Sequence, residues 1–192
     1  INDESRLKNA ADFKSQLAVC KALGAGCIGT ETTSMEKQPA GTTREEAQEL
    51  LCRSLADILP AAEALGVTVA VEPVTYHSMN SAATRHILDT MRSPNLKVIF
   101  DMSNLVDAGN VGAQDRIWND VGELLGDQIV AVHFKGQAFA PDGGLLHTSL
   151  EDSLTDYAGA FAMLRQLPQD ALPVLREEAV PARAASDIAF MR

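Results

Sequence analysis

The stretch VAVEPV, residues 69–74, decides the fold and gives the first indication of the chemistry. An apolar, β-prone run ends in Glu72, and Pro73 follows at once. Because proline cannot donate to a strand ladder, we expect the strand to end here with a carboxylate at its carboxyl end. Three further runs share the pattern of apolar residues followed by a polar one: VIFDMSN (98–104) with Asp101, VAVHFKG (130–136) with His133, and PVLREEA (173–179) with Glu177.

Helical and strand-like patterns alternate along the chain. The predicted helices cover residues 5–23, 81–92, 113–125 and 182–191, with one more ending at Gly66 and another around 157–164. The predicted strands cover residues 27–31, 67–72, 96–101, 129–134 and 173–177. Thr42 and Thr43 each stand three residues before a glutamate, so two overlapping capping boxes can start the helix that ends at Gly66.

The strands are continuous apolar runs, which is typical of parallel strands covered on both faces. Their alternation with helices predicts successive βα units in one domain over residues 1–192. A doubly wound open sheet and a (β/α) barrel both fit this order. No glycine-rich phosphate loop is present, and barrels carry catalytic groups at the carboxyl ends of their strands, which favours the barrel. The residues at the predicted strand ends are Glu31, Glu72, Asp101, His133 and Glu177.

Composition narrows the function. The chain has 192 residues, of which 46% are hydrophobic and 22% charged, as in ordinary globular proteins. A formal net charge of −10 argues against nucleic-acid binding, which needs basic patches. No apolar run is long enough to span a membrane, and no secretory signal pattern occurs. Three cysteines without a metal-like spacing suit a reducing cytoplasm, which is the predicted location.

The polar strand ends predict a metal site. A single strand-end aspartate is most often a turn or cap residue, but four such residues on successive strands make coincidence a poor explanation. Three carboxylates cannot share a small dry site without a positive charge, because desolvated like charges repel. One divalent cation resolves this repulsion. Carboxylates with one imidazole suit Mn²⁺, Mg²⁺, Zn²⁺ or Co²⁺ and do not select among them.

These motifs together resemble the sugar phosphate isomerase/epimerase superfamily, the xylose isomerase-like TIM barrels. The matching stretches follow the family order: KALGAGCIGTET (21–32), GVTVAVEPVTYHSMN (66–80), SPNLKVIFDMSNLVD (93–107), IVAVHFKG (129–136) and PVLREEA (173–179). The resemblance implies an α/β fold, the TIM (β/α)8 barrel. It also implies that this chain is a C-terminal portion, about strands four to eight, lacking the first three βα units.

The resemblance further implies the site and the reaction. Glu72, Asp101, His133 and Glu177 correspond to the family's metal ligands. Glu72 and Glu177 would also transfer the proton next to a substrate carbonyl, as catalytic acid and base. The substrate would be a small sugar or sugar phosphate, and the reaction an isomerisation or epimerisation through an enediolate. A homo-oligomer is the alternative way in which a short barrel would be completed.

Five further residues are predicted to contact the substrate: Glu31, His77, Asn80, Asn104 and Lys135. Each has a plainer alternative, such as a helix cap for Asn80 or a strand-end surface lysine for Lys135. Asn104 stands where many relatives have histidine, and Gly136 where many have aspartate. Glu177 and Glu178 are neighbours in the predicted strand and should point to opposite faces. We prefer Glu177 as the ligand because PVLRE (173–177) is more similar to the corresponding strand of the family. Arg176 is expected to form a salt bridge with a helix.

Two alternative functions remain open at this point. The first is a metal-dependent nuclease of the endonuclease IV type, which shares the barrel but needs additional histidines and a basic face. The chain has only four histidines in addition to its acidic balance. The second alternative is an inactive, sugar-binding remnant of the family, and retention of all four ligands argues against it.

Overall fold

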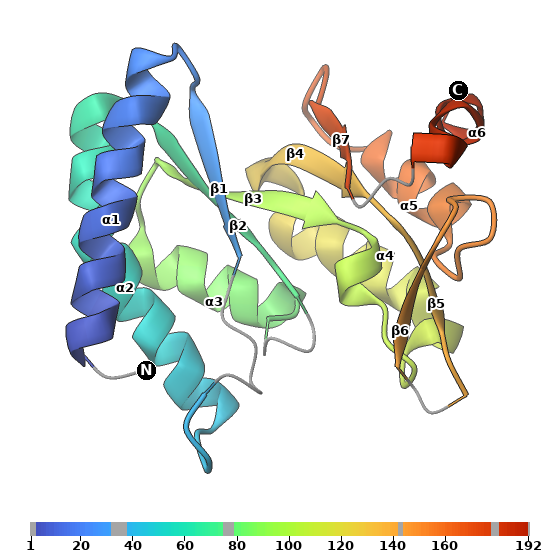
Figure 1. Cartoon of the computed structure of the whole chain (residues 1–192), viewed down its shortest axis with the longest axis horizontal. Coiled ribbons are helices and arrows are strands. Elements are labelled where there is room, and N and C mark those ends of the chain that lie inside the picture. The colour runs from blue at the N-terminus through green and yellow to red at the C-terminus, as the bar shows by residue number, and fades with distance from the viewer. Residues whose placement is uncertain (1–2, 32–37, 75–78, 142–143, 178–180, 192) are drawn as a thin grey trace. The chain divides into compact units, whose positions relative to one another are not determined.

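The computed structural model describes residues 3–31, 38–74, 79–141, 144–177 and 181–191 (Figure 1). The chain forms two compact units, residues 1–99 and 100–192. The boundary between them falls inside strand β3 (Leu96–Asp101), which therefore runs from the first unit into the second. The single-domain organisation stays a prediction.

The first unit consists of parallel strands and the helices that connect them. Its elements are α1 (Asp3–Ala22), β1 (Cys27–Glu31), α2 (Arg44–Leu65), β2 (Thr68–Glu72), α3 (Ser81–Met91) and the start of β3. The strands lie in the order β1-β2-β3 and are parallel, with Ile28 opposite Val69 and Val69 opposite Leu96. Helix α1 packs against α2 (Figure 1). Leu17 and Leu55 of these helices are buried with Val69, which gives the unit an apolar core.

The ends of α2 follow from its sequence. The Thr43 hydroxyl accepts a hydrogen bond from the N–H of Glu46 at 3.1 Å, and the Glu46 carboxylate accepts one from the N–H of Thr43 at 2.8 Å. Of the two capping boxes that the sequence allows, the one at Thr43 therefore forms. The helix ends at Gly66, whose φ of 64° lies in the left-handed region that favours glycine.

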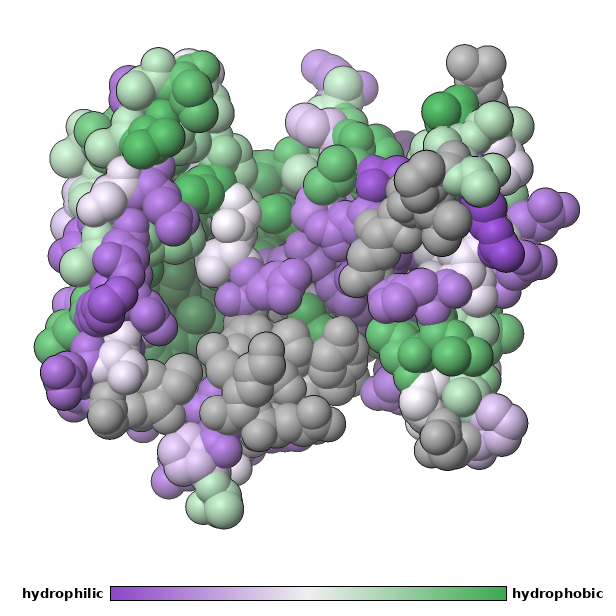
Figure 2. Space-filling view, in the orientation of Figure 1, coloured by the Kyte–Doolittle hydropathy of each residue, from purple (hydrophilic) through white to green (hydrophobic). Residues whose placement is uncertain are grey.

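The exposed side of α1 changes along the helix. Hydrophilic side chains cover its N-terminal part, whereas apolar side chains gather at its C-terminal end, in the upper left of Figure 2. Val19 of α1 and Leu23, directly after the helix, are exposed. Arg6 forms an ion pair with Asp57 of α2 and so joins the two helices in the polar part. None of the helices in the described part of the chain is long and apolar enough to cross a bilayer.

The second unit contains the remaining elements. These are the helices α4 (Gln114–Leu125), α5 (Tyr157–Leu164) and α6 (Ala184–Phe190), the strands β4 (Ile129–Phe134), β5 (Gly136–Phe139), β6 (Leu145–Thr148) and β7 (Val174–Arg176), and the 3-10 helices η3 (Ser103–Leu105), η4 (Val111–Ala113), η5 (Gly126–Gln128) and η6 (Pro181–Arg183). Strands β4 and β7 are parallel. The ring of Phe134 stacks on Phe161 at 5.3 Å and lies 5.8 Å from Tyr157, and these rings bind the strand to α5.

Most predicted elements are confirmed, including the parallel strands at 27–31, 96–101 and 129–134. Two short strands were not among the predicted elements, namely β5 (Gly136–Phe139) and β6 (Leu145–Thr148), which contains His147. Strands β5 and β6 form an antiparallel hairpin in which Gln137 pairs with His147. Each strand has four residues, which is too short for a period-two pattern to be distinguished from a loop.

Gly136 begins this hairpin at a point of close backbone approach. A Cβ atom at this position would overlap the carbonyl oxygens of Thr148 and Ser149. Any side chain, including the aspartate expected from relatives, is therefore excluded unless the hairpin moves away. The glycine is required by the close packing of the start of β5 against the end of β6.

Candidate metal centre

Three titratable side chains of the second unit come together where its strands end. Asp101 ends β3, His133 is next to last in β4, and Glu177 directly follows β7. His133 lies opposite Leu175 in the β4–β7 register, two residues before Glu177. Because successive side chains alternate between the faces of a strand, His133 and Glu177 point to the same face.

The three side chains form a compact cluster. Nδ1 of His133 lies 2.9 Å from Oε1 of Glu177. Asp101, His133 and Glu177 each have a ligand atom within 4.8 Å of those of the others. Asp101 is fully buried, His133 is 9% exposed, and the side chain of Glu177 is 22% exposed. This partial shielding from water strengthens the interactions between their charges.

The two carboxylate oxygens of Asp101 have different partners. Oδ1 accepts hydrogen bonds from the N–H groups of Ser103 at 2.8 Å and Asn104 at 3.2 Å, which fixes the turn into η3. Oδ2 lies 3.2 Å from Nζ of Lys135. The turn thus orients the carboxylate and leaves Oδ2 close to the ammonium of Lys135.

Lys135 supplies the positive charge in this cluster. Its ammonium also lies 3.5 Å from Oε2 of Glu177, and its side chain is only 8% exposed. The plainer expectation of a surface lysine is therefore wrong. A buried ammonium between two carboxylates offsets the repulsion that Asp101 and Glu177 would otherwise exert on each other.

Glu177 is held in its ionised form. A hydrogen bond with His133 is the largest cause that lowers the pKa of Glu177 below its ordinary value, and the charges of His133 and Lys135 lower it further. Partial burial acts in the opposite direction. The net lowering means that Glu177 is a carboxylate at neutral pH and can act as a ligand or a proton acceptor.

A buried hydrogen-bond network fixes the backbone at Lys135, and sequence reasoning did not identify it. The hydroxyls of Ser103 and Tyr157 both donate to the carbonyl of Lys135, at 2.6 and 2.5 Å. The amide of Gln137 donates to the carbonyls of Ser103 and Val106. No local pattern marks these residues, because they come from segments far apart in the sequence.

Glu72 lies in the first unit, at the end of β2, and is 3% exposed. The strand register pairs it with Glu31 at the end of β1, so both side chains project from the same face of the sheet. The role of Glu72 as a fourth ligand and that of Glu31 as a substrate contact stay predictions.

The other predicted site residues have diverse environments. The Asn80 side chain accepts from the N–H of Ala83 and caps α3, as its alternative interpretation states. Asn104 is 3% exposed. His77 and Glu178 lie outside the described residues. Substrate contacts for Asn80, Asn104 and His77 stay predictions, as does the preference for Glu177 over Glu178 as a ligand.

Arg176 is the last residue of β7, directly before Glu177, and its ion pair is with a helix. Its Nε lies 2.9 Å from Oδ2 of Asp187 in α6, and this ion pair confirms the predicted helix contact. Asp187 is 2% exposed and also accepts from the N–H of Leu150. The ion pair therefore serves to attach α6 to the strand.

The donor set of the second unit fits a divalent cation. Carboxylate oxygens and imidazole nitrogens bind Mn²⁺, Mg²⁺, Zn²⁺ and Co²⁺ in proteins. A doubly charged ion within reach of Asp101, His133 and Glu177 would offset the repulsion between the two carboxylates. The ligand types do not distinguish among these ions.

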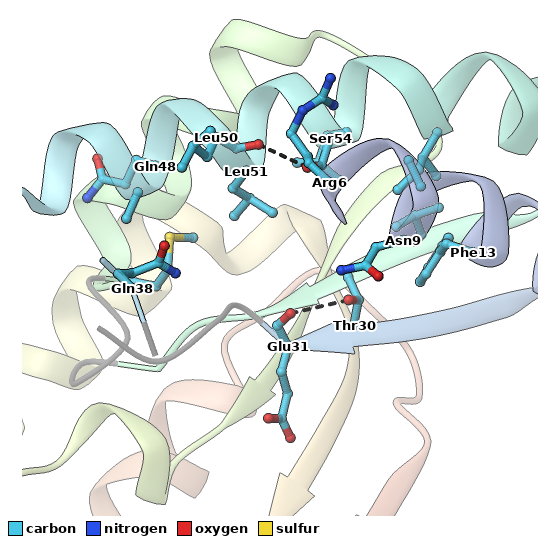
Figure 3. A pocket seen from close by; sticks show the side chains of 16 residues that line it. Arg6, Asn9, Phe13, Thr30, Glu31, Gln38, Gln48, Leu50, Leu51 and Ser54 are labelled. Atoms are coloured by element: carbon cyan, nitrogen blue, oxygen red, sulfur yellow. Dashed lines mark hydrogen bonds between the residues drawn. The ribbon is translucent and has the colours of Figure 1, made fainter. Parts of the chain in front are cut away.

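A cavity of about 210 Å³ lies in the first unit between α1, α2 and the end of β1 (Figure 3). Its walls are largely apolar, with Phe13 and Leu51 among them, and Oε1 of Gln38 is buried there without a hydrogen-bond partner among the described residues. The carboxylate of Glu31 points away from the helical side chains around it (Figure 3). The described lining residues include one carboxylate, that of Glu31, and no histidine.

A family model and several solved structures match the fold of this chain. The family model described as xylose isomerase-like TIM barrel matches residues 1–192. No curated protein sequence matches the chain significantly. Among solved structures, an IOLI protein with a bound zinc atom superposes with a TM-score of 0.77 at 18% identity, covering 100% of this chain and 68% of that one.

Two similar structures are named as epimerases or epimerase-like proteins. A D-tagatose 3-epimerase-like protein has a TM-score of 0.78 at 13% identity, covering 100% of this chain and 70% of its own. The 3-keto-D-glucoside 4-epimerase YcjR from E. coli has a TM-score of 0.70 at 20% identity, covering 100% and 73%. At these identities the likeness shows the fold, and the present chain spans about two thirds to three quarters of each structure.

Proposed function

Because the chain belongs to the xylose isomerase-like TIM barrel family, we propose that it is a divalent-metal-dependent isomerase or epimerase of a sugar or sugar phosphate. The cluster of Asp101, His133 and Glu177, with ligand atoms within 4.8 Å of one another, is the observation that carries this proposal. The epimerisations named for two similar structures support the reaction class.

In this proposal, Asp101, His133 and Glu177 hold the cation, and Glu72 completes the set. The β2–β3 register supports the inclusion of Glu72. Val71 lies opposite Val98, so Glu72 is level with Ile99, two residues before Asp101. The strand pleat then directs Glu72 and Asp101 to the same face. When bound, the cation supplies a Lewis acid for the negative charge that develops on the substrate oxygens.

The chain's own residues carry the proton transfer. One of Glu72 and Glu177 removes the proton from the carbon next to the carbonyl, and the other returns a proton to the neighbouring carbon or to the opposite face. The lowered pKa of Glu177 supports its ionised form at neutral pH, and Nδ1 of His133 lies 2.9 Å from Oε1 of its carboxylate. Glu31, His77, Asn80, Asn104 and Lys135 are the proposed contacts to substrate hydroxyls or to an anionic group.

Solvent exchange tests this function directly. The Mn²⁺-loaded protein is incubated in D₂O with ketoses and ketose phosphates, including D-tagatose, and deuterium is located by NMR. We expect incorporation at the carbon next to the carbonyl, its loss in Glu177→Gln, and its retention in the control Glu123→Gln, an exposed residue of α4. Nicking of abasic DNA without exchange in any sugar would instead identify a nuclease and refute the proposal.

A further inference from the structure

We propose that the ammonium of Lys135 acts as an internal counter-ion that competes with the divalent cation, so that metal binding requires its displacement. The inference rests on the proposed function, since it concerns the same metal centre. It concerns a step that precedes the reaction, namely how the centre exchanges one kind of positive charge for another.

The position of the ammonium carries this inference. Nζ of Lys135 lies 3.2 Å from Oδ2 of Asp101 and 3.5 Å from Oε2 of Glu177. These carboxylates belong to the proposed ligand set. Oδ1 of Asp101 is already used by the turn into η3, so Oδ2 is the oxygen that both cations need. A metal ion and the ammonium therefore share an acceptor and repel each other across it.

Burial makes this competition strong. The side chain of Lys135 is 8% exposed and that of Asp101 is fully buried, so water screens their interaction little. An ion that enters the centre gains the same carboxylates but must also disrupt a shielded ion pair. The apparent metal affinity is reduced by the free energy of that pair.

The ammonium of Lys135 can leave the carboxylates only by movement of its side chain, because the backbone around it is fixed. Its carbonyl accepts hydrogen bonds from Ser103 and Tyr157, and the following Gly136 is packed against the backbone of Thr148 and Ser149. The backbone is thus fixed on both sides of the ammonium-bearing residue. Rotation of the flexible four-carbon stem is the movement by which the ammonium leaves the carboxylates.

Calorimetric titration of the full chain with MnCl₂ tests the inference. Lys135→Met removes the charge and keeps a side chain of similar length, and Lys135→Gln is a second neutral variant in case the first folds poorly. We expect each neutral variant to bind Mn²⁺ at least about tenfold more tightly than the original chain, with a lower metal-free melting temperature. Lys135→Arg should not bind more tightly, and Lys21→Met, an exposed lysine of α1, controls for net charge.

The neutral variants should have a higher Mn²⁺ affinity and a lower metal-free melting temperature. These opposite changes distinguish a lysine that competes with the metal from one that only stabilises the fold. If Lys135 only stabilised the fold, its neutral variants would be less stable and would bind Mn²⁺ equally or more weakly, which would overturn the inference. If the original chain binds Mn²⁺ and the neutral variants bind no more tightly, the inference fails while the proposed function survives. If neither the original chain nor the variants bind the ion, both fail together.

Discussion

Asp101 uses its two carboxylate oxygens for different purposes. One oxygen accepts the N–H groups of Ser103 and Asn104, and the other faces the ammonium of Lys135. An aspartate at a strand end is ordinarily explained by a turn, and here the turn is present together with the charged cluster. The sequence predicts the residue and its strand end, whereas the division between its oxygens depends on the fold around it.

Asp101→Asn separates these two roles. The amide oxygen can still accept from Ser103 and Asn104, so the turn should form, but the second carboxylate oxygen is lost. We expect Mn²⁺ affinity to fall by about a hundredfold or more, because even residues that only support a ligand contribute about 10–100-fold. Calorimetry measures the affinity, and circular dichroism verifies the fold.

A matched control exists in the same unit. The side chain of Asp107 likewise accepts the N–H groups two and three residues later, those of Gly109 and Asn110. Asp107→Asn should therefore leave Mn²⁺ affinity unchanged. Equal losses in both variants would mean that the turn, and not the ligand oxygen, governs binding.

The lowered pKa of Glu177 predicts that the stability of the metal-free protein depends on pH. The pKa of Glu177 is lowered in the folded state, mainly by the hydrogen bond with His133, whereas the unfolded chain has an ordinary value of about 4.3. The resulting stabilisation is fully present above that value and is lost as the pH falls towards the lower, folded pKa.

Urea unfolding between pH 6 and pH 3 measures this effect. Glu177→Gln should lose less of its free energy of unfolding than the original chain as the pH falls below about 4.3, since it lacks the titrating group. Glu123→Gln is the control for removing an exposed carboxylate from the same unit. Parallel pH profiles for the original chain and Glu177→Gln would contradict the prediction.

At the scale of elements, the long apolar strands and the amphipathic helices were predictable, and the β5–β6 hairpin was not. A buried parallel strand such as β4 has a continuous apolar pattern that is visible in the sequence. The hairpin has strands of four residues, and most residues of β6 are exposed. Its position depends on close packing between Gly136 and the backbone at Thr148, which no local propensity encodes.

Gly136→Ala tests the packing of the hairpin. The added methyl group would overlap the carbonyl oxygens of Thr148 and Ser149, and backbone atoms cannot move aside as a flexible side chain can. We expect a loss of about 1–3 kcal/mol in the free energy of unfolding, measured with urea, as for other overpacked sites. Gly112→Ala is the control, since a Cβ there would meet nothing within 4 Å. Equal stability of the two variants would exclude the close approach.

At the scale of the whole molecule, the family was predictable because its motifs stand at the ends of successive strands in a fixed order. The match of the family model to residues 1–192 confirms it. The polar network around the carbonyl of Lys135 was not predictable, since Ser103, Gln137 and Tyr157 meet only after the chain has folded. The division into two compact units, with β3 in both, also has no composition signal.

Chelation provides a prediction for the whole molecule. With EDTA we expect the far-UV circular dichroism spectrum of the folded chain to persist, because Lys135 offsets the charges of Asp101 and Glu177 without an ion. Adding Mn²⁺ at about 100 times its dissociation constant should then stabilise the fold by about 2.7 kcal/mol. Unfolding by EDTA alone would show instead that the metal is part of the fold.

The ammonium between Asp101 and Glu177 also orders events in the life of the protein. A newly synthesised chain can close this part of its structure before it has met an ion, since its own lysine neutralises the acidic groups. If the proposed centre binds an ion, metal acquisition is a late step, which takes place after this part of the chain has folded. Under the proposed function, the supply of the ion would then set how much of the protein carries the ion, and not how much of it is folded.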